Sequence, residues 1–425
     1  MTRSVSSYTI NNFEQVKAQV LNWLQQFSTF CFLDNQNYPT TSKFQCLAGA
    51  DIHKKISPAT NSFSRLEAFV KLHQDWIFGH FSYDLKNQVE KLDSLKADHI
   101  HFPELLFFVP KIVLFIGDSE LTIETINENN DAIYAEIIKT DTSSKTEDTQ
   151  CLQLNPRFSK AEYLATVSRL QEHIHHGDCY EINFCQEFFA NGFNCNPVKI
   201  FKSLSAVSAN PFSCLYTVEN SWLLCASPER YLKKTGDQII SQPIKGTASR
   251  INYTDETDEQ DKLRQSKKDK SENVMIVDLV RNDLSKICTE GSVHVQELFG
   301  IYSFPQVHQM ISTVAGTLKD QEDYSQIFKA TFPMGSMTGA PKIKVMQLIE
   351  KYERSKRGIF SGAVGYFSPE GDFDFNVVIR SMMYNAATKY MCIMAGSAIT
   401  GNSIPEEEYE ECLVKIKGLL KALHL

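Results

Sequence analysis

Two short runs of strand-forming residues, 223–226 and 238–242, flank a segment that ends in Lys-Lys-Thr-Gly-Asp. Gly236 and Asp237 are residue types that a tight chain reversal requires, so this stretch predicts a β-hairpin. The hairpin constrains the fold because it ties two reactive groups to neighbouring strands. An acid, Glu229, and an amine, Lys245, are expected to meet at one site.

Each of these two groups has an ordinary and a chemical interpretation. A lysine in a Pro-Ile-Lys-Gly-Thr turn is ordinarily a solvated charge, and Glu229 is ordinarily a strand-end carboxylate paired with Arg230 or a nearby lysine. As a nucleophile, Lys245 must be unprotonated, which requires burial or a cationic neighbour. Glu229 would then be a general acid held protonated by partial burial. Spacing alone leaves both interpretations open.

Composition narrows the class of function. The net charge of -8 argues against a broad nucleic-acid or acidic-membrane surface, so small-molecule chemistry is favoured. The eleven cysteines include no Cys-x-x-Cys pair, which fits a reducing cytoplasm. The apolar run 105–117 is interrupted by Pro110 and Lys111 and is too short to span a bilayer. We expect two buried strands there and no transmembrane segment.

The chain is long enough for two or three domains or one large one. Residues 139–150 are almost entirely Thr, Ser, Lys, Asp and Glu, a composition typical of a loop. We therefore predict an N-terminal region, 1–140, that contributes strands and a helix, a polar linker at 141–155, and a catalytic region at 156–425. A helix is expected over 11–30 from its apolar spacing.

Acids and glycines recur in the second half at positions suited to a binding site. A mostly apolar helix begins near Ser271, and its isolated acid Glu272 must be paired, protonated or on a metal if buried. Residues 332–344 form a glycine-rich loop that enters a helix and can present backbone N–H groups to an anion. This loop lacks the Gly-Lys-Ser/Thr ending of a nucleotide P-loop.

The last helix begins after Ser403 and carries five glutamates in its first turns. Acids near the start of a helix interact favourably with the helix dipole, but five acids are more than this interaction requires. Glu408 and Glu411 are three residues apart, so they share a face and could hold Mg²⁺ together. Arg380, near the end of a strand predicted over 373–384, is either a structural ion pair or a clamp for a carboxylate.

Long motifs occur in a specific order: Ser-Pro-Glu-Arg at 227, Pro-Ile-Lys-Gly-Thr at 243, Glu-Asn-Val-Met-Ile-Val-Asp-Leu-Val-Arg-Asn-Asp at 272, Gly-Ser-Met-Thr-Gly-Ala-Pro-Lys at 335 and Gly-Ala-Val-Gly-Tyr at 362. Together they resemble the chorismate-utilising enzymes, the family of anthranilate, isochorismate and aminodeoxychorismate synthases. The resemblance covers 159–425 nearly continuously and is looser before that. It implies an α+β fold, with two antiparallel β-sheets packed as a sandwich, helices on the outside and the active site between the sheets.

Within this family, the lysine of Pro-Ile-Lys-Gly-Thr resembles component I of aminodeoxychorismate synthase, where anthranilate synthase typically carries alanine. The resemblance implies that Lys245 adds to C2 of chorismate as the C4 hydroxyl leaves, with Glu229 supplying the proton. Ammonia then enters at C4 and expels the lysine. The product would be 4-amino-4-deoxychorismate, on the route to p-aminobenzoate and folate.

The resemblance also implies how substrate and metal are held. Mg²⁺ would bind Glu272, Glu408 and Glu411 and face the ring carboxylate. Further implied substrate contacts are Arg380, Tyr366, Lys415 and the amides of Gly396, Ser397 and Ala398 for the enolpyruvyl carboxylate, His308 and Ser336 for the ring, and Thr247. Glu181 stands where isochorismate and salicylate synthases place a lysine that activates water. This departure weakens a water-adding reaction and leaves the role of Glu181 open.

The nitrogen source implies a partner. The chain contains no Gly-x-Cys-x-Gly glutaminase elbow, so a separate glutamine amidotransferase subunit, component II, is expected to supply ammonia. One alternative is anthranilate synthase component I, which Lys245 disfavours. The other is a catalytically silent homologue that acts as a binding subunit, which Lys245, Glu229 and the three candidate metal acids disfavour.

Overall fold

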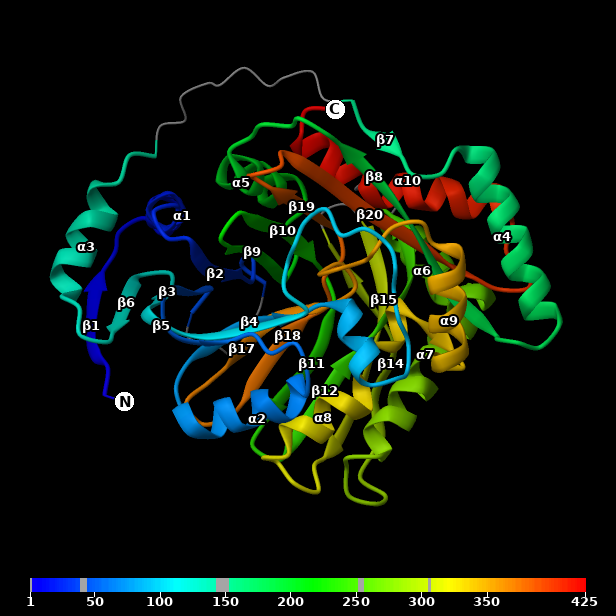
Figure 1. Cartoon of the computed structure of the whole chain (residues 1–425), viewed down its shortest axis with the longest axis horizontal. Helices are drawn as coiled ribbons and strands as arrows, with labels where there is room; N and C mark the ends of the chain where they lie inside the picture. Colours follow the sequence, from blue (N-terminus) through cyan, green and yellow to red (C-terminus); the bar gives the residue numbers. More distant parts are fainter. Residues whose placement is uncertain (1, 39–43, 143–152, 251–255, 305–306) are drawn as a thin grey trace.

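The computed structural model describes residues 2–38, 44–142, 153–250, 256–304 and 307–425 (Figure 1). The core of the predicted linker, 143–152, lies outside the described residues. The helical segments are α1 (Phe13–Leu24), α2 (Ser62–His73), η1 (Tyr83–Gln88), α3 (Asn130–Lys139), α4 (Lys160–His175), α5 (Pro197–Val207), α6 (Glu256–Gln265), α7 (Lys267–Ser285), α8 (Tyr324–Thr331), η2 (Gly335–Met337), α9 (Lys342–Tyr352) and α10 (Pro405–Ala422).

The strands are β1 (Ser4–Thr9), β2 (Thr29–Asp34), β3 (Cys46–Ile56), β4 (Ile77–Phe81), β5 (Leu105–Ile116), β6 (Glu120–Thr125), β7 (Asn155–Pro156), β8 (Glu181–Ala190), β9 (Phe212–Val218), β10 (Ser221–Ser227), β11 (Arg230–Thr235), β12 (Gln238–Gln242), β13 (Ile244–Ser249), β14 (His294–Ser303), β15 (Val307–Thr317), β16 (Gly339–Ala340), β17 (Ala363–Phe367), β18 (Phe373–Asn376), β19 (Ser381–Asn385) and β20 (Tyr390–Ile399).

Antiparallel pairing links the N-terminal strands to the rest of the chain. β2 pairs with β9, and β4 pairs with β17, so residues 1–140 contribute strands to the network that carries the C-terminal motifs. The expected α+β class with antiparallel strands and surrounding helices is confirmed. The hydrogen bonds, however, join the strands into one continuous network instead of two separate sheets.

Two hydrophobic cores stabilise this network. One is rich in phenylalanine and joins β4, β5, β17 and β18 to α8, with the rings of Phe81 and Phe328 4.5 Å apart. The other lies between strands and the helices α1, α4, α5, α9 and α10. Figure 1 shows α10 lying along β20, where the last helix buries Cys412, Ile416 and Leu419. The helices α7 and α10, which carry Glu272 and Glu408, both bury an apolar face, and this burial fixes their positions relative to the strands.

The hairpin at the centre of the sequence differs in one respect from the prediction. The two runs are not consecutive strands, because β11 lies between β10 and β12 and pairs with β12 across the turn at Gly236. Glu229 occupies the β10–β11 connection, and Lys245 is the second residue of β13. The pairing of Arg230 with Gln242 still brings the two groups together.

Two other predicted strands also differ. β5 passes through Pro110 as one strand, and its register with β3 shifts there, so the proline falls where the ladder is irregular. The strand expected over 373–384 is divided into β18 and β19. Arg380 lies in the interruption with a φ of 51°, a left-handed conformation that a continuous strand cannot accommodate.

The helix predictions agree more closely with the structure than the strand predictions do. Ser159 and Glu162 form a capping box at the start of α4, with Glu162 Oε2 accepting a 2.8 Å bond from the Ser159 amide. α1 is shorter than the predicted 11–30, and α7 begins four residues before Ser271. Within the described ranges, no helix is long and apolar enough to cross a bilayer.

Candidate active site

Lys245 and Glu181 form a buried ion pair. Their side chains are 9% and 1% exposed, and Lys245 Nζ lies 2.5 Å from Glu181 Oε1. Burial alone would lower the pKa of Lys245, but the carboxylates of Glu181, Glu272 and Glu229 outweigh it and raise this pKa. The solvated interpretation of Lys245 is therefore wrong. At rest, the lysine is an ammonium ion surrounded by acids.

Glu229 is a second buried group beside this pair, at 4% exposure. Burial raises its pKa to about 7, against the opposing effects of the Ser336 hydroxyl and the Lys245 ammonium. Its backbone is fixed by a 3.0 Å bond from the Val377 amide to the Glu229 carbonyl. Near neutral pH, this carboxyl can therefore hold a proton and donate it.

Glu272 on α7 and Glu408 on α10 face each other across one ammonium group. Lys268 Nζ lies 3.3 Å from Glu408 Oε1 and 4.0 Å from Glu272 Oε1. Burial, reinforced by the charges of Glu181 and Glu411, raises the pKa of Glu272 to about 7. Among the described residues, Glu272 Oε1 and Glu408 Oε2 are buried without a hydrogen-bond partner. Such oxygens, with a cation already between them, suit an oxygen-seeking metal ion.

The third predicted metal acid is engaged elsewhere. Glu411 Oε1 lies 2.6 Å from Lys415 Nζ, and the same ammonium donates a 2.7 Å bond to the Gly396 carbonyl. Burial would raise the pKa of Glu411, but Lys415 and other cations outweigh it and lower the pKa. Across the described ranges, three or more His, Cys, Asp or Glu side chains do not converge as a ready metal site.

Arg380, whose backbone is left-handed, lies near the Glu411 carboxylate. Burial lowers the pKa of its guanidinium, and the Glu411 carboxylate opposes that shift. Its carbonyl accepts a 3.1 Å bond from the Ala226 amide, two residues before the loop that carries Glu229. Arg380, Lys415 and Gly396 are thus connected through Glu411, and the two cations are of the kind that can bind a carboxylate.

The other predicted substrate contacts divide into two groups. Ser336 is buried in η2 next to Glu229, while His308 on β15 pairs with Ala248, three residues after Lys245. His308 Nδ1 lies 2.8 Å from the Ser303 hydroxyl. Thr247 is an exposed residue of β13.

The second group consists of Ser397, Ala398 and Tyr366. The Ser397 hydroxyl lies 3.3 Å from the Tyr163 hydroxyl of α4, whereas the backbone of Ala398 pairs with Asn183. Tyr366 packs its ring against Trp76 and Phe78, with centroids 5.6 and 6.3 Å away. The structure therefore does not join Tyr366 to the group around Arg380.

Sequence reasoning missed the residue that braces this site. Arg357 is buried and donates to both Glu353 oxygens, at 2.9 and 2.6 Å. It also donates to the carbonyls of Met337 and Asn183, at 2.7 and 2.9 Å. It thereby links the Ser336 loop to β8, the strand that begins with Glu181. Lys268 was missed too, although its i, i+4 spacing to Glu272 is a usable signal.

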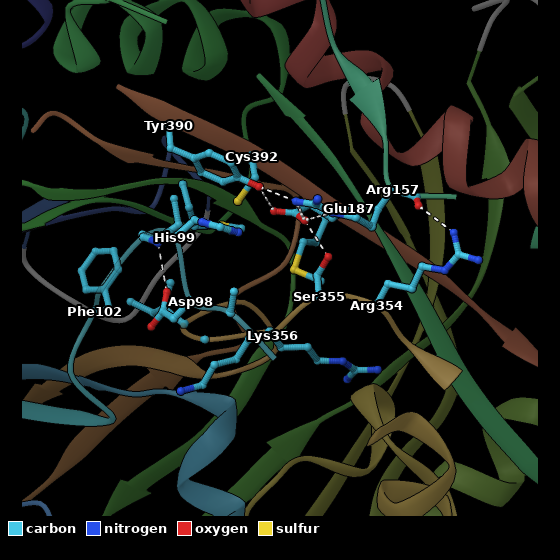
Figure 2. A pocket seen from close by; sticks show the side chains of 17 residues that line it. Asp98, His99, Phe102, Arg157, Glu187, Arg354, Ser355, Lys356, Tyr390 and Cys392 are labelled. Atoms are coloured by element: carbon cyan, nitrogen blue, oxygen red, sulfur yellow. Dashed lines mark hydrogen bonds and ion pairs between the residues drawn. The ribbon is translucent and has the colours of Figure 1, made fainter. Parts of the chain in front are cut away.

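A separate cavity of about 130 Å³ lies further along β8 and β20. Figure 2 shows Arg157, Tyr390 and Ser355 converging on Glu187 there. The Glu187 carboxylate accepts bonds of 2.6 Å from Tyr390 and from Ser355, and pairs with Arg157 at 2.8 Å. Because Glu187 has three donors, we interpret this cluster as structural.

Comparisons with known proteins identify the family of the chain. The family described as chorismate binding enzyme matches residues 28–421. Aminodeoxychorismate synthase component 1 of Escherichia coli is 33% identical over 352 residues, covering 82% of this chain and 77% of that protein. Anthranilate synthase component 1 of Aquifex aeolicus is 30% identical, covering 82% and 74%.

Solved structures share the fold. Anthranilate synthase component I from Streptococcus pneumoniae superposes with a TM-score of 0.76 at 23% identity, covering 90% of this chain and 93% of that one. The menaquinone-specific isochorismate synthase of Escherichia coli gives 0.77 at 17% identity, covering 99% and 95%. The family match spans most of the chain, and the motifs, fold and buried acids are consistent with it. The chain belongs to the chorismate binding enzyme family.

Proposed function

We propose that this chain converts chorismate and ammonia to 4-amino-4-deoxychorismate through a covalent adduct on Lys245. The observation that carries the proposal is the burial of Lys245 within reach of Glu181, Glu229 and Glu272. A buried lysine at this position has no use in direct attack by ammonia on chorismate, but it can serve as a nucleophile. Relatives named aminodeoxychorismate synthase component 1 support the same reaction.

The reaction consists of two displacements: Lys245 displaces the C4 hydroxyl, and ammonia then displaces Lys245. Lys245 loses one proton and attacks C2, the two conjugated ring double bonds shift, and the C4–O bond breaks. Glu229 protonates the departing hydroxyl, which leaves as water, and recovers the proton that the lysine gives up. Ammonia then attacks C4, the double bonds shift back, and the C2–N bond breaks to release Lys245. Glu229 is suited to this role because its pKa of about 7 lets it give and take protons near neutrality.

The charged groups around Lys245 and Glu229 would bind the substrate. Glu272 and Glu408 would hold Mg²⁺ through their unpartnered oxygens, with Glu411 nearby. The ion would neutralise the ring carboxylate that otherwise faces these acids. Arg380 and Lys415 are cations available to the enolpyruvyl carboxylate. Ammonia would come from a glutamine amidotransferase subunit, which the name component 1 of the relatives favours, and we place the reaction in the cytoplasm.

The test is direct product analysis. The purified chain is incubated with chorismate, Mg²⁺ and concentrated ammonium, and products are identified by chromatography with mass spectrometry beside Lys245→Ala. We expect aminodeoxychorismate from the wild type and its loss in the variant. Anthranilate would instead identify the reaction of anthranilate synthase component 1. No turnover even with an amidotransferase present would favour a binding subunit.

A further inference from the structure

We infer that Glu181 is the binding site for the nitrogen substrate: it holds an ammonium ion beside Lys245 and delivers ammonia to C4. This inference rests on the proposed function, because it assigns the second displacement of that reaction. Glu181 has no part in the steps derived above, yet it makes the closest contact of the catalytic lysine. Its carboxylate is one of the most deeply buried charges in the described structure, at 1% exposure.

The two oxygens of Glu181 have different surroundings. Oε1 accepts from Lys245 Nζ, whereas Oε2 is buried without a hydrogen-bond partner among the described residues. A buried carboxylate oxygen without a donor is costly, and a small cation with N–H groups removes that cost. Three carboxyl groups, Glu181, Glu229 and Glu272, act on the single ammonium of Lys245, so the local charge also favours a second cation.

The surrounding backbone keeps this carboxylate in place. Gly339 of the glycine-rich loop lies so close that a Cβ there would meet the Glu181 carbonyl at 2.1 Å. The backbone pairing of Gly339 with Ile182 and of Ala340 with Glu181 holds the loop against the start of β8. A glycine is needed at 339 because its φ of 141° lies outside the range of other residues. Glu181 is therefore positioned by rigid elements on both sides.

The geometry of a carboxylate suits the two positions that react. C2 and C4 are in a 1,3 relation on the ring, and the separation of these carbons is similar to that of the two oxygens of a carboxylate. One oxygen can thus direct the lysine nitrogen to C2 while the other directs ammonia to C4 of the same ring. No other residue of the site contacts Lys245 and also presents a second, unpartnered oxygen in the described part of the chain.

Protons balance through this one carboxylate. The bound ammonium gives a proton to Glu181, and the resulting ammonia attacks C4, which leaves a protonated amine on the product. The C2–N electron pair returns to Lys245, which departs as a neutral amine. Lys245 then takes the proton from Glu181, and the resting ion pair is restored.

The test separates the two displacements. Wild type, Glu181→Gln and the matched control Glu187→Gln are mixed with chorismate without ammonium, and the Lys245 adduct is measured by mass spectrometry of the acid-quenched protein. Turnover is then titrated with ammonium chloride at one pH, with potassium chloride holding the ionic strength constant. Glu187 is a buried carboxylate of the same strand that faces the other cavity (Figure 2).

For Glu181→Gln we expect the Lys245 adduct still to form and the KM for ammonium to be raised about tenfold or more, since a charged acceptor is replaced by an amide. Lys245 would draw the amide oxygen toward itself and leave the NH₂ group facing the ammonium. Glu187→Gln should leave this KM unchanged. Glu181→Asp, which keeps the charge, should fall between the two and serves if the glutamine variant does not fold.

The outcomes are distinguishable. An unchanged ammonium KM in Glu181→Gln, or loss of the adduct in that variant alone, would overturn the role of Glu181 while the proposed reaction stands. Absence of the adduct from the wild type would overturn the covalent reaction and this inference with it.

Discussion

Replacing Glu229 by glutamine should abolish the reaction and at the same time stabilise the folded protein at alkaline pH. Glu229 is 4% exposed, and its burial raises the pKa to about 7 from 4.5. The folded state therefore binds more protons than the unfolded state between these two values. The free energy of unfolding that Glu229 contributes is fully present below about pH 4.5 and falls as the pH rises through about 7.

The magnitude follows from the shift. Raising the pKa from 4.5 to about 7 corresponds to a loss of about 3 kcal/mol of stability once Glu229 is ionised. Part of this loss has occurred by about pH 5.5, so about 2 kcal/mol remains to be lost between about pH 5.5 and about pH 8.5. Glutamine matches the protonated carboxyl in shape and does not ionise. The Glu229→Gln variant should therefore gain about 2 kcal/mol over the wild type across this interval.

The assay is equilibrium denaturation by urea at both pH values, followed by tryptophan fluorescence and by circular dichroism. Glu187→Gln is the control, because it leaves the partly buried Arg157 guanidinium without its carboxylate and should lose stability at both pH values. A difference between Glu229→Gln and the wild type that does not change with pH would refute the reasoning. It would mean that Glu229 is solvated or fully paired in the folded protein.

Three further predictions follow from other contacts of the site. Lys268→Met should lower the Mg²⁺ concentration needed for half-maximal turnover several-fold, since its ammonium competes for Glu408 and Glu272; an unchanged requirement would place the metal elsewhere. Gly396→Ala should destabilise the fold by about 1–3 kcal/mol in denaturant titrations, because the added Cβ would meet Cys185 Sγ at 2.4 Å. Arg357→Met should cost about 3–5 kcal/mol by leaving Glu353 buried and unpaired, and Glu353→Gln in the same chain should restore much of it; a double variant as unstable as the single one would argue against the pair.

The sequence predicted the local features whose causes are local. The turn at Gly236 depends on residues within a few positions of one another, and it is present. The acidic start of α10 and the isolated acid of α7 were recognised for the same reason. Glu272 and Glu408 come together because of packing between helices far apart in sequence, so their meeting rested on family resemblance alone.

What the sequence could not show are the long-range partners. Nothing near Lys245 in the chain indicates that Glu181, 64 residues away, is its contact. In the sequence, Arg357 is one of several cations after α9, although its acceptors in the structure include Glu353, Met337 and Asn183. The expected strand over 373–384 failed because apolar alternation does not reveal the left-handed residue, Arg380, that divides it.

Lys245 is charged in the resting site, but it must be neutral to act as a nucleophile. Protonation of the acids around it affects the balance between these two states. Burial favours the neutral amine, and three carboxylates together oppose it. Burial raises the pKa of two of these, Glu229 and Glu272, to about 7, so each can gain or lose a proton near neutral pH. In the proposed reaction, protonation of Glu229 would make it the acid that the C4 hydroxyl needs and would also weaken the electrostatic attraction that keeps Lys245 charged. In the proposed reaction, a single protonation would therefore prepare both the leaving group and the nucleophile.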